Sequence, residues 1–515
     1  MTGSSDGLID VLRGAGIIFL GTIIGRGIGL LGEVLLARIL LPDQFGDIAL
    51  AYTIVSMLAV IVTLGTAQGV PRLISGDESQ ERKQRLLLSG FSITISIGLL
   101  TFISLIAFSS TIGEIFGNPE MATVLPWFGL YLLTFPAARV SIGGLRGIEQ
   151  SWKTVVARNS GRISGIVGLV FMIWIGAETI GAVGYYIVTQ LIIALVAAYF
   201  LYEQLFAGTG RNWMPNKSEI NETFSFSWPL AVSSGFLILV GNFDILMVGY
   251  FLESRQVGYY RAIQPLALLL LVILSSFVFL FMPIVTKHYK SNDINIVNNL
   301  FTSTTKLVSL IAFPIALVFV LFSEDVVVAF YGADYAPAAL AFSVLATGSY
   351  LRVFVGPNAA MIKAINRTRI DMISAVAGLL VNIILNVTLI PIYGISGAAF
   401  ATGVGYFVYN VIELGVVYHS IGTHPFSLNT VKPLIPTTVV AISIASLTAS
   451  QSLDLIMLLV IGGVIAIIQF VSVFATQSLE TTDELILQRL ENRLGVDLPF
   501  VTQQIEGQNN KEEEL

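Results

Sequence analysis

The chain has 515 residues, of which 55% are hydrophobic and only 12% are charged, and its formal net charge is −6. A soluble globular chain carries about 25% charged residues, so the composition excludes a soluble protein and predicts an integral membrane protein. The absence of cysteine excludes disulfides and thiolate metal sites, and three histidines that are not paired at helical spacing argue against zinc.

Apolar runs follow one another along nearly the whole chain. Each has roughly 18 to 25 residues, enough for an α-helix to cross a hydrocarbon core of ~30 Å. The sequence therefore predicts an all-α polytopic membrane protein with fourteen spans. They lie at residues 12–37, 46–69, 87–110, 122–145, 160–177, 180–203, 226–252, 258–284, 304–323, 336–361, 372–392, 395–418, 433–450 and 455–476.

Basic residues are concentrated in the loops on one side of these spans. The opposite loops, near 111–121, 178–179, 324–335, 393–394 and 451–454, contain no lysine or arginine. Because basic loops remain in the cytoplasm, both termini are predicted to be cytoplasmic in a multi-pass protein of the cell membrane. The basic loops hold Arg72, Arg82, Lys83, Arg85, Arg146, Lys153, Arg158, Arg162, Arg211, Lys217, Lys287, Lys290, Lys363, Arg367, Arg369 and Lys432.

The two ends of the chain differ from its apolar body. Residues 1–10 lack the basic region and cleavage site of a signal peptide, so the first apolar run is expected to be retained. Beyond residue 477, Thr481 and Glu484 predict a capping box before a short amphipathic helix on the cytoplasmic face, with a frayed polar tail as the alternative. Residues from 502 onward are expected to be disordered.

An internal repeat organises the spans. A shift of 212 residues aligns Leu40 with Leu252, Gln44 with Gln256, Gly46 with Gly258, Leu58 with Leu270 and Pro71 with Pro283. Six spans is an even number, so the two halves are predicted to be parallel repeats, which is typical of transporters. The predicted divisions are two six-helix lobes at 1–210 and 211–425, two additional spans at 426–477 and a tail at 478–515.

Charged residues inside the spans nominate a candidate site. A charge at the bilayer centre costs at least about 2.5–3.5 kcal/mol, so it usually faces a partner or a wet cavity. Arginine binds phosphate through a planar fork of donors and keeps its charge in low dielectric. The sequence therefore predicts a basic cleft for a phosphate or pyrophosphate group, lined by Arg26, Glu33, Arg139, Arg261 and Arg352.

The spacing of these residues leaves two interpretations open. Arg139 and Arg352 lie 213 residues apart, at near-equivalent positions of the two halves. Arg26 with Glu33, and Asp244 with Arg261, could instead form structural ion pairs. Asp244 beside Asn242 is also a candidate for binding a coupling cation or proton, with the membrane potential as another energy source.

Several functional classes lack their motifs. The sequence contains no Gly-Lys pair, which excludes a P-loop. It has no nucleophile elbow, and its basic loops lack the interleaved aromatic residues of a nucleic-acid site. We therefore expect no enzyme activity, no cofactor or metal and no nucleic-acid partner. Glycines of the first span (Gly14, Gly21, Gly25 and Gly29) form G-x-x-x-G units that predict close helix packing.

Three segments of the chain indicate a family resemblance. Residues 36–46, LARILLPDQFG, resemble the "LARxLGPxxFG" turn of Wzx-type polysaccharide flippases of the MOP (MATE-like) superfamily. Residues 244–252 with 257–260 resemble that family's seventh-helix signature, and residues 394–399 match the small-residue start of its twelfth helix. The resemblance covers roughly residues 10–475.

The resemblance implies a mechanism and partners. A Wzx-type flippase moves a polyprenyl- or dolichyl-phosphate-linked saccharide outward by alternating access, for surface polysaccharide or protein N-glycan assembly. Its implied partners are membrane lipids and glycosyltransferases or an oligosaccharyltransferase of the same pathway, and its last two helices would form a groove for the lipid tail. Arg26 and Glu33 match functional positions of the lipid II flippase branch, with a looser match for Arg261. Two positions depart from the pattern: Leu41 replaces the usual glycine of the turn, and Gly32 stands where the lipid II branch has a second first-helix arginine, which favours the Wzx branch.

Three rival functions remain. A MATE-like cation-coupled exporter of small organic molecules would need acidic residues in the cleft, whereas arginine predominates in the spans. A membrane glycosyltransferase would need large outer loops with paired carboxylates, and none is present. A non-transporting scaffold of a glycan-assembly complex is the third alternative.

Overall fold

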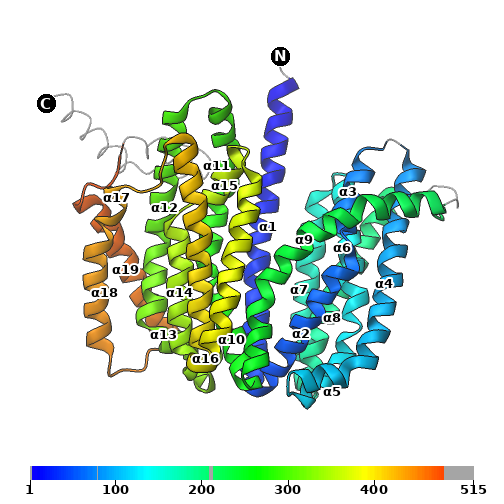
Figure 1. The fold of residues 1–515 in the computed structure, drawn as a ribbon, viewed down its shortest axis with the longest axis horizontal. Coiled ribbons are helices and arrows are strands. Elements are labelled where there is room, and N and C mark those ends of the chain that lie inside the picture. Colours follow the sequence, from blue (N-terminus) through cyan, green and yellow to red (C-terminus); the bar gives the residue numbers. More distant parts are fainter. Residues whose placement is uncertain (1–2, 78, 208–212, 481–515) are drawn as a thin grey trace. The chain divides into compact units, whose positions relative to one another are not determined.

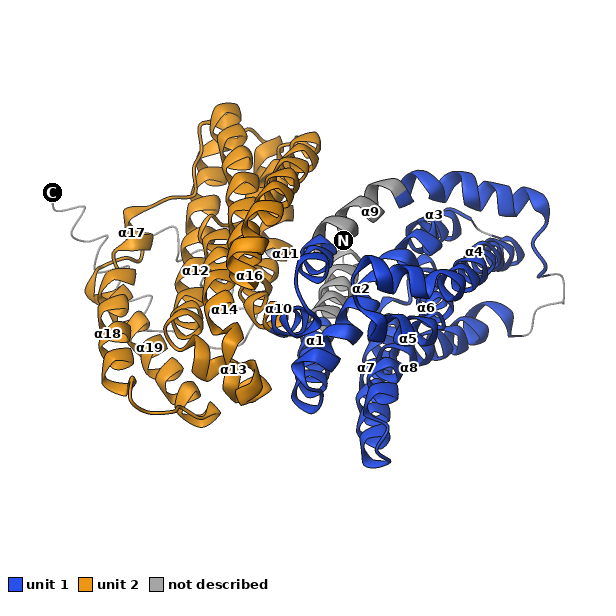
Figure 2. Cartoon of the chain, turned by 60° about the horizontal axis from the view of Figure 1, so that its bottom comes forward, with its two compact units in different colours: residues 1–262 blue, residues 263–515 orange. Residues whose placement is uncertain are grey.

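The computed structural model describes residues 3–77, 79–207 and 213–480 and, within them, all side chains except those of 3–20, 232–241 and 280. All the regular elements in these ranges are helices, so the predicted all-α fold class is confirmed. The chain divides into two compact units, residues 1–262 and 263–515, coloured separately in Figure 2. The predicted amphipathic segment beginning at Thr481 lies outside the described residues.

Unit 1 contains the first ten α-helices and a π-helical turn (Figure 1). α9 packs against α2, α3 and α4, which explains why this helix groups with the N-terminal half of the chain. The elements are α1 (Gly3–Ile39), α2 (Pro42–Thr63), α3 (Thr66–Ser75), α4 (Gln80–Ile115), α5 (Pro119–Phe128), α6 (Tyr131–Gly147), α7 (Ser151–Trp174), α8 (Glu178–Leu201), η1 (Tyr202–Phe206), α9 (Lys217–Phe251) and most of α10 (Ser254–Ala267).

Unit 2 begins near the end of α10. Its last two long helices, α18 and α19, pack on each other and on α12 (Figure 1). The elements are α11 (Leu269–Lys290), α12 (Ile294–Leu321), α13 (Ser323–Tyr331), the 3₁₀ helix η2 (Ala333–Ala338), α14 (Ala339–Phe354), α15 (Asn358–Ala364), α16 (Thr368–Ile421), α17 (Leu428–Val431), α18 (Leu434–Thr448) and α19 (Leu455–Ala475).

Each predicted span falls on one or more of these helices, although the number of spans is not confirmed. Among the described residues, nine helices are long and apolar enough to cross a membrane, or ten if the bent pair α5–α6 is one span. The polar residues of α7, including Arg158 and Arg162, lower its hydropathy, and α16 counts once although it covers the two spans predicted at 372–392 and 395–418. The many-pass membrane class is therefore confirmed, whereas fourteen remains a prediction, as do the domain boundaries.

Breaks in the helices lie where the backbone is permissive. Gly394 adopts φ 59° and ψ −140° inside α16, a conformation that a side chain would disfavour, and it divides the helix into two halves. This break falls in the small-residue segment 394–399. Leu64 and Gly65 separate α2 from α3 with φ values of 43° and 71°, and α5 meets α6 at 43°. The bends in the helices therefore occur at Gly394, at Leu64 and Gly65, and between α5 and α6.

Two glycines of α1 bring α7 into close contact. A Cβ atom on Gly21 would collide with the side chain of Val155, and one on Gly25 would collide with Arg162 and Asn159. Asn159 Nδ2 donates a hydrogen bond to the Gly21 carbonyl oxygen at 3.2 Å. The close packing predicted from the G-x-x-x-G pattern is therefore confirmed at these two positions.

A buried lysine anchors the end of the described chain. Lys306 of α12 is fully buried, and its Nζ donates to the Ser478 carbonyl oxygen at 3.1 Å and lies 3.5 Å from Glu480 Oε1. Asn429 Nδ2 and Ser427 Oγ donate to the same Glu480 oxygen at 2.6 and 3.2 Å. Burial raises the pKa of Glu480, but these hydrogen bonds and the Lys306 charge outweigh it and hold the pKa below its usual value.

We predict that Glu480→Gln lowers the stability of unit 2 at neutral pH by roughly 2–3 kcal/mol, because the buried ammonium loses its carboxylate. The stabilisation is present above the ordinary glutamate pKa of about 4.3 and is lost as the pH falls through the lower folded-state pKa. Thermal unfolding in detergent should therefore separate E480Q from the wild type at neutral pH but not in strongly acidic buffer. The double variant K306M/E480Q should recover most of the loss, since it buries no unpaired charge. A wild-type midpoint for E480Q at neutral pH would contradict the prediction.

Candidate functional site

An ion pair joins α1 to α10 in unit 1. Arg261 Nη2 lies 3.0 Å from Glu33 Oε1, and both side chains are less than a fifth exposed. The Tyr186 hydroxyl donates to the same carboxylate at 3.2 Å. The sequence nominated Glu33 and Arg261 separately, and the structure brings them together as partners. The two charges neutralise each other here, so this pair adds little net charge to the site.

Aromatic rings enclose this pair. Tyr186 stacks on Tyr52 with ring centroids 4.0 Å apart, and Tyr131 meets Tyr52 edge-on at 5.6 Å. The Arg261 guanidinium lies 5.7 Å from the Tyr52 ring centroid, on the face where a cation is attracted. Since the rings exclude water, the ion pair is strengthened and Arg261 is held in place.

A second group of charges is entirely positive. The guanidinium group of Arg139 on α6 repels those of Arg158 and Arg162 on α7. Arg146 on α6 also repels Arg158, and Arg26 on α1 repels Arg162. We call these five residues the arginine cluster. Among the described residues, Arg139, Arg146, Arg158 and Arg162 form no ion pair with a carboxylate. These four arginines therefore carry positive charge that no described carboxylate neutralises.

The packing of α1 on α7 positions one edge of the cluster. Arg162 crosses α1 at Gly25, where there is no side chain to displace it, and donates to Asn159 Oδ1 at 3.4 Å. The Arg139 guanidinium lies 4.7 Å from the centroid of Phe135, one turn earlier on α6. Arg26, Arg139 and Arg146 are exposed, whereas Arg158 and Arg162 are half-buried. The arrangement can present several guanidinium forks to one polyvalent anion.

The sequence nominated only Arg26 and Arg139 of this cluster. Arg146, Arg158 and Arg162 were assigned to a basic cytoplasmic loop, because the positive-inside rule accounts for them without a site. The spacing of Arg158 and Arg162, four residues apart, is a signal for one helix face. That signal becomes informative once α7 is known to begin at Ser151 rather than near residue 160.

Arg352, the remaining nominated arginine, lies in unit 2. Its guanidinium sits 4.6 Å from the ring centroid of Tyr406 and 5.6 Å from that of Tyr409. It forms no ion pair within the described part of unit 2. Arg139 and Arg352 thus resemble each other, since each lies over an aromatic ring without a carboxylate partner.

The candidate coupling residues have a different environment. Asp244 on α9 is half-buried and accepts a hydrogen bond from the Tyr260 hydroxyl at 3.4 Å, and Asn242 lies half a turn before it. The described residues contain no group of three or more His, Cys, Asp or Glu side chains that could hold a metal ion. A coupling role for Asp244 and Asn242 stays a prediction.

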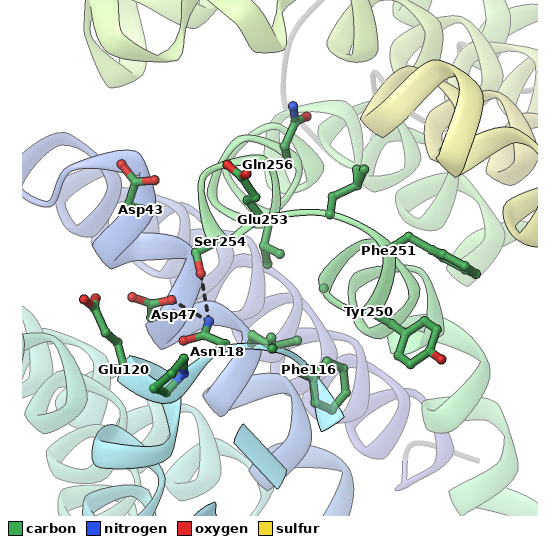
Figure 3. Close-up of a pocket in the computed structure, with 16 residues that line it drawn as sticks. Asp43, Asp47, Phe116, Asn118, Glu120, Tyr250, Phe251, Glu253, Ser254 and Gln256 are labelled. Carbon is green, nitrogen blue, oxygen red and sulfur yellow. Dashed lines mark hydrogen bonds between the residues drawn. The ribbon is translucent and has the colours of Figure 1, made fainter. Parts of the chain in front are cut away.

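A cavity of about 850 Å³ lies where the helix ends of unit 1 meet (Figure 3). Asn118 Nδ2, at the start of α5, donates to Asp47 Oδ1 on α2 and to Ser254 Oγ on α10, both at 2.7 Å. A Cβ on Gly46 would collide with the Ser254 carbonyl, and one on Gly258 would collide with that of Pro42. The repeat-related glycines therefore allow the starts of α2 and α10 to cross in contact. None of this junction was nominated as a site from the sequence.

The sequence of this chain resembles those of known membrane proteins. A family model described as "Polysaccharide biosynthesis protein" matches residues 11–289, and one described as "MatE" matches residues 229–388. The chain is 23% identical over 447 residues to the lipid II flippase MurJ of Bacillus subtilis, covering 77% of this chain and 80% of the relative. It is 22% identical over 408 residues to the "Probable low-salt glycan biosynthesis flippase Agl15" of Haloferax volcanii, covering 79% and 83%.

Solved structures share the fold. A structure of the lipid II flippase MurJ in an inward closed conformation matches with a TM-score of 0.69 at 15% identity, over 88% of this chain and 97% of that chain. An inward-facing multidrug resistance MATE family transporter of the MOP superfamily matches with a TM-score of 0.64 at 15% identity, over 77% and 94%. The MATE-like fold and the resemblance to the MOP superfamily are therefore confirmed. The matched proteins are flippases and transporters rather than enzymes, as predicted for this chain.

We predict that Asn118→Asp destabilises the junction of α2, α5 and α10 by about 1–3 kcal/mol. Aspartate keeps the helix cap on the Met121 amide, but it cannot donate to Asp47 and places a second carboxylate beside it. The matched control is Asp454→Asn, which exchanges the same two residue types at the exposed cap of α19. Thermal unfolding in detergent should show a lower midpoint for N118D and little change for D454N. Equal midpoints for the two variants would contradict the prediction.

Proposed function

The chain belongs to the family of polysaccharide biosynthesis proteins, and from this premise we propose that it is a flippase that carries a lipid-linked saccharide from the cytoplasmic to the outer face of the cell membrane. The observation that carries the proposal is the arginine cluster of unit 1, in which Arg139, Arg146, Arg158 and Arg162 have no carboxylate partner among the described residues. A phosphate or pyrophosphate that links a sugar to its lipid would supply the missing negative charge.

The relatives support this class of cargo. One is named a lipid II flippase and another a probable glycan biosynthesis flippase. We propose a polyprenyl- or dolichyl-(pyro)phosphate carrier and a product used for surface polysaccharide or protein N-glycan assembly. Glycosyltransferases that build the lipid-linked saccharide, and a polymerase or oligosaccharyltransferase that consumes it, are the proposed partners.

Transport would follow alternating access in the orientation inferred from the basic loops. With both termini in the cytoplasm, the cluster would meet the head group at the cytoplasmic side, since Arg146 and Arg158 flank the loop between α6 and α7. Separating the starts of α2 and α10, which Asn118 holds together, would open the opposite side. The groove for the lipid tail remains assigned to α18 and α19.

The rival transporter function is a MATE-like exporter of organic cations. It is considered because the fold matches that of a multidrug resistance MATE family transporter. The arginine cluster opposes this function because like charges repel. Deleting the gene distinguishes the two: the flippase predicts loss of surface glycan and accumulation of lipid-linked precursor, whereas the exporter predicts greater sensitivity to organic cations with normal glycan.

We predict that Arg158→Ala with Arg162→Ala reduces glycan export at least about tenfold, because each guanidinium–phosphate interaction contributes about 1.5–3 kcal/mol. The measurement is surface glycan and precursor in a deletion strain that expresses the variant, with the amount of protein in the membrane determined in parallel. Arg72→Ala, at an exposed position near the end of α3, is the matched control and should leave export normal. R158K/R162K should be intermediate, since lysine keeps the charge but loses the fork. Normal export by R158A/R162A would refute the role of the cluster and favour a scaffold.

We also predict that inorganic pyrophosphate raises the thermal unfolding midpoint of the purified protein. At a pyrophosphate concentration one hundred times its Kd, binding should add about 2.7 kcal/mol to the free energy of unfolding. R158A/R162A should lose this shift, and sodium sulfate at equal ionic strength should reproduce little of it. An equal shift in both proteins would assign the effect to ionic screening rather than to the cluster.

A further inference from the structure

A fully buried carboxyl group in unit 2 has no place in the mechanism above. Glu413, in the second half of α16, is 0% exposed, and neither of its side-chain oxygens has a hydrogen-bond partner in the described structure. An ionised carboxylate in such surroundings is disfavoured, because burial removes the hydration that would stabilise its charge. An ionisable residue inside a membrane span is a functional candidate for the same reason.

A short series of polar groups connects Glu413 to the surface of unit 2. Tyr409, one helical turn earlier, acts electrostatically on Glu413, and its hydroxyl donates to Asp371 Oδ1 at 2.8 Å. Asp371 Oδ2 lies 3.0 Å from Lys363 Nζ, and these two side chains are 25% and 41% exposed. The series therefore runs from an exposed ion pair, through one hydroxyl, to a buried acid.

The ionisable groups around Glu413 come from four elements. Lys363 on α15 and Asp371 in the first half of α16 act on it together with Tyr409. The guanidinium of Arg352 on α14 lies 5.6 Å from the centroid of the Tyr409 ring, which is one turn before Glu413 on α16. Tyr289 on α11 belongs to the apolar cluster around Val417, one turn beyond Glu413. Among these groups the only cations are Lys363, which Asp371 neutralises, and Arg352.

We propose that Glu413 is a proton-binding site that couples transport to a proton movement, with Tyr409 and Asp371 as its path to solvent. In this proposal the Glu413 carboxyl group is protonated while it is buried. For the proton to leave, a rotation of the side chains first brings the Tyr409 oxygen into hydrogen-bond contact with the Glu413 carboxyl group. The Glu413 O–H bond then breaks and the Tyr409 oxygen accepts that proton. The original Tyr409 hydroxyl proton passes to Asp371, and Asp371 releases it to water. One proton moves and no other reactant is required.

The link to transport depends on the proposed function, because it needs an anionic cargo at Arg352. The Tyr409 ring lies 5.6 Å from the Arg352 guanidinium, and Tyr409 also interacts electrostatically with Glu413. A negative charge on Glu413 would therefore weaken the attraction of Arg352 for an anion. A neutral Glu413 favours anion binding, and an ionised Glu413 favours release. By reciprocity, anion binding should favour uptake of a proton.

The first experiment detects the proton itself and requires no cargo. The purified protein is compared with Glu413→Gln, which has the shape of the protonated acid, by infrared spectroscopy in the carboxylic acid C=O region. At neutral pH the wild type should show the band of a protonated acid in apolar surroundings, and E413Q should lack it. The band should disappear reversibly in alkaline buffer. Ser374→Ala, a buried neutral neighbour in the first half of α16, is the control and should keep the band.

A second variant keeps the proposal testable if E413Q does not fold. Tyr409→Phe removes the hydroxyl from the path but leaves Glu413 in place. The band should persist at neutral pH and respond to a pH jump more slowly, on the order of tenfold or more, than in the wild type. An unchanged rate would remove Tyr409 from the path and overturn that part of the proposal.

The final measurement adds inorganic pyrophosphate at a pH where the band is half-lost. Since Glu413 already holds a proton in half of the molecules at this pH, the wild type should take up as much as about half a proton per chain on binding, and E413Q should take up none while still binding pyrophosphate. Absence of the band in the wild type, or equal proton uptake by E413Q, would overturn the proton site. A titrating band in a protein that does not bind pyrophosphate would instead refute the proposed cargo, so the two failures are distinguishable.

Discussion

Like charges held together near a medium of low dielectric repel one another strongly, and the five guanidinium groups of the arginine cluster are under this constraint. Arg139 and Arg146 on α6, Arg158 and Arg162 on α7, and Arg26 on α1 come from three helices that the fold holds close together. Arginine remains charged under these conditions, so the repulsion cannot be relieved by losing a proton. An anionic ligand would relieve it, which is why the proposed class of cargo depends on the cluster more than on any single residue.

Elsewhere the chain neutralises its buried charges internally. Glu33 pairs with Arg261 and Lys306 with Glu480, each across helices or segments far apart in the sequence. Such pairs fix the relative positions of helices, although they contribute less to stability than their short distances suggest, because both groups lose hydration. Intramembrane charges therefore divide into two groups. Paired charges fix the positions of helices, and groups without a partner of opposite charge are proposed to bind an anionic ligand or a proton.

Glycine determines how closely the helices that carry these charges approach. Gly25 allows Arg162 to lie across α1, and Gly46 and Gly258 let the starts of α2 and α10 touch. The last two glycines are 212 residues apart, the shift of the internal repeat, and each faces the backbone around the other. A side chain at either position would separate the junction that Asn118 bridges. Close backbone contact and two hydrogen bonds from Asn118 hold this junction together.

The all-helical membrane class, the charges within the apolar runs and the family resemblance were predictable from the amino-acid sequence. Hydropathy and helix period are local properties, so a window of about twenty residues contains the information. The partner of Glu33, the joining of Arg146, Arg158 and Arg162 to the cluster, and the isolation of Glu413 were decided by tertiary structure alone. Glu33 and Arg261 are 228 residues apart, and their contact depends on which helices pack together. The positive-inside rule accounts for the basic loop residues without a site, so their place in the cluster could not be read from the sequence. Burial of Glu413 depends on how the helices of unit 2 pack.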